Sequence, residues 1–106
     1  MKVEILPTAW ACLQQIRWNV YERFGKEVAE KVTDKILDSI ERLETYPDSG
    51  TMTPDPWLNR EGYRMVVANK HNVSIFRKVD DTVYVYFIAD TRMDYPKLFR
   101  STINPE

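Results

Sequence analysis

The stretch that most constrains the fold consists of two β-branched and aromatic runs, residues 73–79 and 82–88, with only two residues between them. Those two residues, Asp80 and Asp81, tolerate the left-handed backbone of a tight turn. The pattern therefore predicts a β-hairpin with a two-residue turn. Another run begins at Tyr63 and predicts a preceding strand, and a charged, aromatic tail follows the hairpin.

A two-residue turn also determines which hairpin side chains share a face of the sheet. One face is expected to pack under helices and form the core, and it carries Phe76, Val83, Val85 and Phe87. The other face is expected to be a semi-open working surface, and it carries Val73, Ile75, Arg77, Val79, Thr82, Tyr84, Tyr86 and Ile88. In this register Ile75 lies opposite Tyr86. A three-residue turn would reverse the faces and place Tyr84 and Tyr86 under the helices.

The first half of the chain predicts a short strand and a pair of helices. Polar and apolar residues alternate over residues 2–6, which is typical of a strand. Thr8 is then expected to be a helix N-cap. Apolar residues at three- and four-residue spacing predict helices over residues 9–24 and 26–45, and the break at Gly25 is so short that the two helices must run antiparallel.

Composition limits the class of protein. The chain has 106 residues, of which 43% are hydrophobic and 29% charged, so residues 1–106 are expected to form one α+β domain. Its antiparallel sheet is expected to be covered on one face by the helical hairpin, with residues 50–62 as a loop. No apolar run is long enough to cross a membrane, and the N-terminus is too short and too charged for a secretory signal, so we expect a cytoplasmic protein. With one cysteine and one histidine, no metal or other cofactor is expected.

The net charge of −1 is divided unevenly along the chain. Residues 1–56 carry 7 basic and 10 acidic side chains, whereas residues 57–106 carry 8 basic and 6 acidic ones. A polyanion should therefore meet the second half, although ordinary surface variation explains the bias equally well.

The order of these elements resembles the RelE/ParE superfamily of bacterial toxins from type II toxin-antitoxin modules. The resemblance covers nearly the whole chain and rests most specifically on Pro47 and Gly50, on Tyr63-Arg64, and on Thr91-Arg92-Met93-Asp94-Tyr95. It implies a small cytoplasmic protein of a plasmid-stabilisation type, which a cognate antitoxin wraps and holds inactive. One branch of the superfamily cuts messenger RNA in the ribosomal A site, whereas the ParE-like branch inhibits DNA gyrase and is not a nuclease.

We expect ribosome-dependent RNA cleavage, with gyrase inhibition as the alternative. Cleavage without a metal needs an activated 2′-hydroxyl, a protonated leaving group and stabilisation of the phosphorane charge. Arginine suits the last task because it stays charged and grips two phosphate oxygens at once. The resemblance implies phosphate contacts for Arg64 and Arg92, and base stacking or proton transfer for Tyr95.

Three further candidates for substrate binding share the semi-open face of the predicted hairpin, namely Arg77, Tyr84 and Tyr86. The sequence also departs from the nuclease branch, which has basic residues where this chain has Val66 and Val73. An isoelectric point of about 5.9 is moreover a poor fit to the anionic ribosome. These departures leave open a third interpretation, a non-catalytic protein that only binds its antitoxin.

Structural roles are an alternative for each candidate. Arg64 and Arg92 could pair with Asp90 or Asp94 to hold the tail against the sheet, and Tyr95 could pack beneath that tail. His71 has a pKa suited to a general base but lies in a turn between strands, where we expect exposure to solvent.

Three aromatic residues fall outside the apolar stripe of the first helix: Trp10, Trp18 and Tyr21. Two interpretations stay open for them. They are either exposed anchors for a partner or an extension of the buried face.

Overall fold

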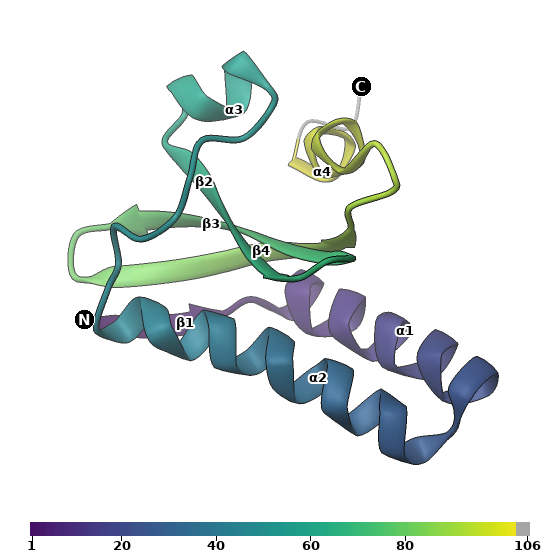
Figure 1. Cartoon of the computed structure of the whole chain (residues 1–106). Coiled ribbons are helices and arrows are strands. Elements are labelled where there is room, and N and C mark those ends of the chain that lie inside the picture. The colour runs from purple at the N-terminus through teal and green to yellow at the C-terminus, as the bar shows by residue number, and fades with distance from the viewer. Residues whose placement is uncertain (104–106) are drawn as a thin grey trace.

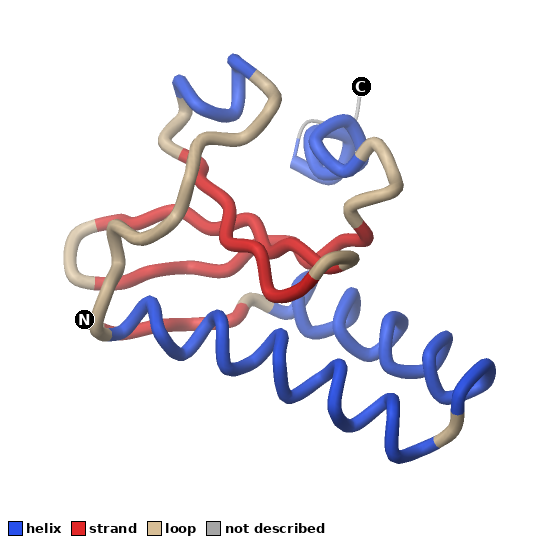
Figure 2. Tube along the Cα trace, viewed as in Figure 1, coloured by secondary structure: helices blue, strands red, loops and turns tan. Residues whose placement is uncertain are grey.

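The computed structural model describes residues 1–103, which form a sheet with helices on both faces (Figure 1). The elements follow one another in the order β1 (Lys2–Ile5), α1 (Pro7–Phe24), α2 (Lys26–Glu41), η1 (Arg42–Glu44), α3 (Pro56–Arg60), β2 (Tyr63–Asn69), β3 (Asn72–Val79), β4 (Thr82–Asp90) and α4 (Tyr95–Ile103). The α1–α2 hairpin covers one face of the sheet, and α3 and α4 lie over the other (Figure 2). None of the described helices is long and apolar enough to cross a membrane.

The sheet has the strand order β1-β4-β3-β2. Strands β2, β3 and β4 run antiparallel, as predicted. Strand β1, however, pairs parallel to β4, with Lys2 opposite Thr82 and Ile5 opposite Val85. The sheet is therefore mixed, and the prediction of a wholly antiparallel sheet was wrong. No local turn links β1 to its neighbour, so the direction of this pairing depends on the path of the intervening chain.

The predicted two-residue turn is confirmed. Val79 lies opposite Thr82, and Asp80 adopts the left-handed backbone with φ at 55°. Tyr84 and Tyr86 lie away from the helical hairpin, as the turn requires, because Val83 and Val85 occupy the core under α1 and α2.

A β-bulge changes the register beyond the turn. Phe76 lies opposite Val85, but Ile75 lies opposite Phe87, so Tyr86 is the extra residue on β4. Beyond Tyr86, each side chain of β4 therefore points to the opposite face of the sheet from the one predicted. Ile88 packs under the helices, and Phe87 packs on the other face, against the expectation for both.

The helical hairpin begins two residues earlier than predicted. Pro7 occupies the first position of α1 and Leu6 is its N-cap, so the assignment of Thr8 as the cap was wrong. Proline suits this position because its φ is already helical and its missing N–H has no partner there to lose. The second predicted helix is divided into α2 and the short η1.

Two hydrophobic clusters hold the layers together. The cluster between the sheet and the α1–α2 hairpin contains Ala9, Leu13, Ile36, Ile40, Leu43, Phe76, Val83, Val85 and Ile88. The cluster on the opposite face contains Leu58, Tyr63, Ile75 and Phe99. The face expected to be semi-open is therefore largely covered by α3 and α4. The prediction that residues 50–62 form only a loop was wrong for α3.

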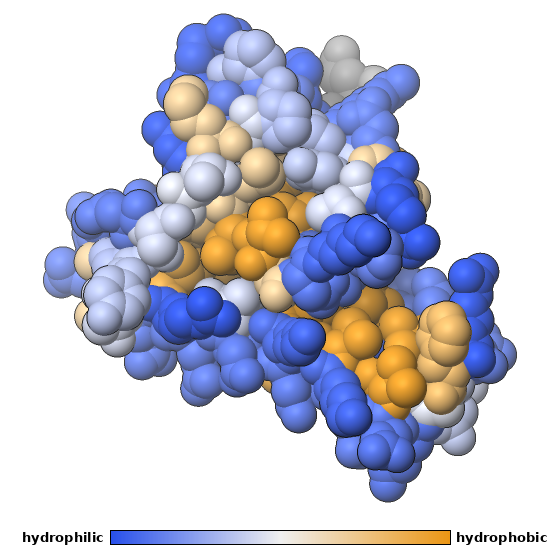
Figure 3. Space-filling view, in the orientation of Figure 1, coloured by the Kyte–Doolittle hydropathy of each residue, from blue (hydrophilic) through white to orange (hydrophobic). Residues whose placement is uncertain are grey.

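The aromatic residues of α1 lie on its outer surface. Trp10, Trp18 and Tyr21 are all exposed, so they do not extend the buried face. Trp18 and Tyr21 stack on each other, with ring centroids 5.8 Å apart. Figure 3 shows further apolar surface on the helical hairpin.

Candidate functional site

Arg77 lies between two tyrosine rings on the face covered by α3 and α4. Its guanidinium carbon is 4.8 Å from the ring centroid of Tyr63 and 5.5 Å from that of Tyr86. One terminal nitrogen donates a hydrogen bond to the Tyr86 hydroxyl (3.1 Å), and the other donates to the carbonyl of Glu61 (3.4 Å). The structure thus brings together two of the predicted binding residues and adds Tyr63 to them.

Tyr84 lies directly opposite Arg77 in the register between β3 and β4 and is half-buried. The Tyr63 ring contacts both Tyr86 and Phe99 edge-on, at centroid distances of 5.2 and 5.1 Å. Burial raises the pKa of the Tyr63 hydroxyl, and the charge of Arg77 only partly opposes this. The Tyr63 hydroxyl therefore favours its neutral form more strongly than an exposed tyrosine does.

Arg64 lies at the start of β2, with its side chain turned back toward α3. One terminal nitrogen donates to two backbone carbonyls, those of Tyr63 (2.7 Å) and Asn59 (3.2 Å). The Asn59 carbonyl belongs to the last turn of α3, where carbonyls lack partners within the helix. Arg64 thus links β2 to the end of α3.

Arg92 forms a two-point ion pair with Asp90 at the end of β4. Its Nε and one terminal nitrogen donate to the two carboxylate oxygens at 2.9 and 2.6 Å. The hydrogen bond from Arg92 outweighs burial and lowers the pKa of Asp90 to about 2. Of the alternatives weighed for Arg92, the pairing with Asp90 is the one found here.

Arg64 and Arg92 lie at different levels along the strands of the sheet. Arg64 pairs with Phe76, which is level with Val85, whereas Arg92 follows Asp90 at the far end of β4. A strand rises about 3.3 Å per residue, so the two backbones are roughly 15–20 Å apart. The structure does not bring these two predicted phosphate contacts together.

Tyr95 begins α4 and packs against the second hydrophobic cluster. Its hydroxyl donates to the sulfur of Met65 at 3.5 Å, and burial raises its pKa. His71 lies in the exposed turn between β2 and β3, as expected. Within residues 1–103, no group of three or more His, Cys, Asp or Glu side chains could hold a metal ion.

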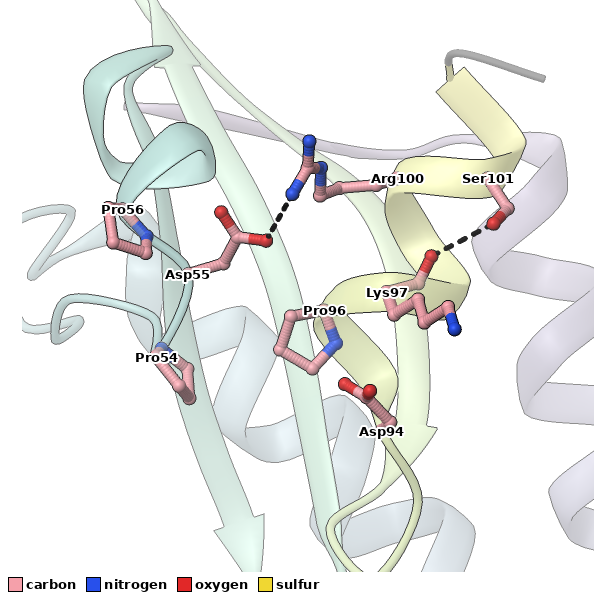
Figure 4. A pocket seen from close by; sticks show the side chains of 8 residues that line it. All are labelled: Pro54, Asp55, Pro56, Asp94, Pro96, Lys97, Arg100 and Ser101. Carbon is pink, nitrogen blue, oxygen red and sulfur yellow. Dashed lines mark hydrogen bonds and ion pairs between the residues drawn. The ribbon is translucent and has the colours of Figure 1, made fainter. Parts of the chain in front are cut away.

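A groove of about 580 Å³ separates the start of α3 from α4 (Figure 4). It is lined by Pro54, Asp55, Pro56, Asp94, Pro96, Lys97, Arg100 and Ser101. An ion pair of 3.1 Å between Asp55 and Arg100 bridges the two helices, and the Arg100 guanidinium lies 5.2 Å from the Trp57 ring centroid.

Asp55 also accepts hydrogen bonds from the backbone N–H groups of Trp57 and Leu58 and so caps α3. Burial opposes its ionisation, but these bonds and Arg100 together outweigh burial, and the pKa of Asp55 lies below its ordinary value.

Comparison with known proteins identifies the family. Residues 3–95 match the family model of the ParE toxin of the type II toxin-antitoxin system parDE. The chain belongs to the ParE toxin family. Membership in this family implies an antitoxin as its partner. Among curated proteins, none matches the chain at a significant level.

Two solved structures share the fold of this ParE toxin. One is described as the chromosomal ParDE toxin-antitoxin system from P. aeruginosa, with a TM-score of 0.72 and 19% identity over 85% of this chain and 95% of that one. The other is a YoeB/ParE toxin from Agrobacterium tumefaciens, with a TM-score of 0.55 and 17% identity over 85% of this chain and 98% of that one.

The elements around the groove carry sequence signals that were missed. Asp55 followed by Pro56 is the pairing of N-cap and first-position proline that often starts a helix. Tyr95, Phe99 and Ile103 recur at four-residue spacing, which is typical of one helix face. Because α3 has only five residues and α4 nine, both signals are short.

Proposed function

We propose that this ParE toxin arrests bacterial growth by binding DNA gyrase and does not cleave RNA. The observation that carries the proposal is that Arg64 and Arg92 lie several residues apart along the strands and turn to different partners. It favours the gyrase alternative over the ribosome-dependent cleavage that the sequence narrowly favoured.

Cleavage chemistry needs its groups within about 3 Å of one reacting phosphate. Arg64 turns toward α3 and Arg92 turns toward Asp90, so the two side chains do not converge on one phosphate in this structure. Each is also engaged within the protein, Arg64 with two backbone carbonyls and Arg92 with Asp90. A phosphate would have to displace these bonds, at a cost that the binding itself must offset. The valines at positions 66 and 73 remove two further charges from such a surface.

Two measurements on the same chain separate the activities. Purified toxin is added to gyrase on relaxed plasmid DNA, and transcripts from cells that express the toxin are mapped by primer extension. We expect loss of supercoiling together with unchanged 5′ ends. New transcript ends that appear on induction, with supercoiling intact, would refute the proposal.

The double variant Arg64→Gln/Arg92→Gln sharpens the comparison. Under the proposal, its folded fraction keeps gyrase inhibition, because neither residue has to touch a phosphate. A nuclease that uses these two arginines would lose its activity while still folded. Circular dichroism and thermal melting provide the measure of folding for both proteins.

A further inference from the structure

A second groove, of about 600 Å³, lies between α1 and α2 beside the turn at Gly25. It is lined by Gln14, Arg17, Trp18, Tyr21, Lys26 and Ala29. The four side chains from α1 recur at three- and four-residue spacing, so they share one face of that helix. Ala29 of α2 is buried and forms the floor. The groove has the size of a site for a small molecule.

Trp18 and Tyr21 form an aromatic wall in this groove. Their rings stack with an interplanar angle of 16°, so each ring helps to hold the other in its orientation. Trp18 is nevertheless 56% exposed and Tyr21 48% exposed. Ring surface is therefore available to a further planar group. Nucleobases suit such a surface, because every base has a face that stacks on an aromatic side chain.

Two cationic side chains lie in the same groove, Arg17 from α1 and Lys26 from α2. Within residues 1–103 neither forms an ion pair, and no carboxylate lines the groove. The groove is thus positive although residues 1–56 carry three more acidic than basic side chains. A terminal phosphate group matches it, because such a group carries about 1.5 to 2 negative charges at neutral pH.

We propose that this groove binds a nucleotide that has a terminal phosphate. The base stacks on Trp18, and the phosphate accepts hydrogen bonds from Arg17 and Lys26. Arginine stays charged and binds two phosphate oxygens at once, and lysine adds a point charge. The inference is independent of whether gyrase is the target, because direct binding tests it without a measurement of toxicity.

The charges argue against a second copy of this chain as the occupant. Two copies that paired through the groove about a two-fold axis would bring Arg17 and Lys26 of one copy toward the same residues of the other. Like charges placed together lower affinity, whereas an anion gains from the same field.

The first test compares three probes that separate the base from the phosphate: AMP, adenosine and ribose 5-phosphate. Each is titrated into the nitrogen-15-labelled toxin at low salt. We expect AMP to shift the indole N–H signal of Trp18 and the amide signals of Arg17 and Lys26. Adenosine and ribose 5-phosphate should each bind at least about fivefold more weakly. A lack of response to AMP, or equal binding of either truncated probe, would overturn the proposal.

The second test removes the stacking surface. Trp18→Leu is compared with Trp10→Leu, which changes an exposed tryptophan of the same helix outside the groove. We expect Trp18→Leu to weaken AMP at least about fivefold and Trp10→Leu to weaken it less than about twofold. Equal effects of the two variants would refute stacking on Trp18. Circular dichroism and thermal melting confirm that both variants are folded.

The third test removes one positive charge. Arg17→Gln is compared with Arg23→Gln, which makes the same change in net charge at an exposed residue of α1 outside the groove. We expect only Arg17→Gln to weaken AMP by at least about fivefold, and we expect it to leave the binding of adenosine unchanged. Equal weakening by both variants would reduce the effect to net charge and refute the site.

Sedimentation tests the alternative occupant. We expect the parent and Trp18→Leu to sediment alike over a range of protein concentrations. Self-association that Trp18→Leu abolishes would assign the groove to an interface between copies of the chain and overturn the proposal.

Discussion

The guanidinium of Arg77 lies 4.8 Å from the ring centroid of Tyr63, directly across the register between β2 and β3. A cation over an aromatic face is attracted by the electron density of the ring. Tyr63 in turn packs on Phe99 of α4. Arg77 thus takes part in holding α4 on the sheet, whether or not it also binds a target.

Replacing Arg77 should destabilise the fold. Arg77→Ala removes two ring contacts and the hydrogen bond to Tyr86, and we expect a loss of about 1–3 kcal/mol in the free energy of unfolding. Urea denaturation measures it. The exposed neighbour Lys78 supplies the control, since Lys78→Ala should change stability by less than about 0.5 kcal/mol. Equal stability of the two variants would contradict the role of Arg77.

Phe99 should be the main anchor of α4. It is buried and contacts the rings of Tyr63, Tyr86 and Phe87. Phe99→Ala should cost about 3–5 kcal/mol, or release α4 from the sheet while the remaining fold persists. Hydrogen exchange of the α4 amides distinguishes these outcomes.

Leu98→Ala changes the adjacent residue of the same helix, where the side chain is 40% exposed. It should cost much less than Phe99→Ala, because little apolar surface returns to water. A larger loss at Leu98 than at Phe99 would mean that α4 is oriented differently.

Gly50 should not tolerate a side chain. A Cβ at this position would overlap the Phe76 ring and come within 3.0 Å of the Met65 carbonyl. Gly50→Ala should therefore cost about 1–3 kcal/mol as the ring is displaced from the core. The adjacent Ser49→Ala should be nearly neutral in thermal melting, because Ser49 is exposed. A Gly50→Ala protein as stable as the parent would show that the Phe76 ring has room to move.

The ion pair between Asp90 and Arg92 should contribute stability that depends on pH. The pKa of Asp90 is about 2 in the fold and 3.8 in its ordinary state, so the folded protein releases this proton more readily. The contribution is fully present above about pH 4 and is lost as the pH falls toward 2. Urea titrations of the parent and of Arg92→Gln should differ above pH 4 and converge near pH 2.

Other carboxyl groups titrate in both proteins and largely cancel in that difference. Arg60→Gln is the matched control, because Arg60 is exposed and makes no side-chain hydrogen bond within residues 1–103. A difference between parent and Arg92→Gln that stays constant from pH 6 to pH 2 would contradict the assignment.

Local signals in the sequence were sufficient to predict the turn of the hairpin, but they were insufficient to predict the register of its strands farther from the turn. Asp80 and Asp81 specify their turn through their own backbone preferences, and the pairing of Val79 with Thr82 follows from that turn. The bulge at Tyr86 has no such local cause. It reverses Phe87 and Ile88, which are both apolar, so either arrangement satisfies the pattern of the strand.

The site was harder to predict than the fold. Arg64 and Arg92 stand close to recognisable motifs, but their distance apart depends on which end of a strand each occupies. The contact between Arg77 and Tyr86 could be predicted from the sequence, because alternation along the hairpin places both residues on one side of it. The contact of Arg77 with Tyr63 depends on how β2 is aligned with β3. No turn of known length fixed that alignment in the sequence.

The parallel pairing of β1 has a consequence for how the toxin is made. Within residues 1–103, the first strand of the sheet in chain order pairs with the last one alone, with Ile5 opposite Val85. Such distant segments meet late, because closing the long intervening loop costs entropy before any contact repays it. A nascent chain therefore cannot complete this sheet until β4 has been synthesised, and β1 waits without its partner while the residues between them are made.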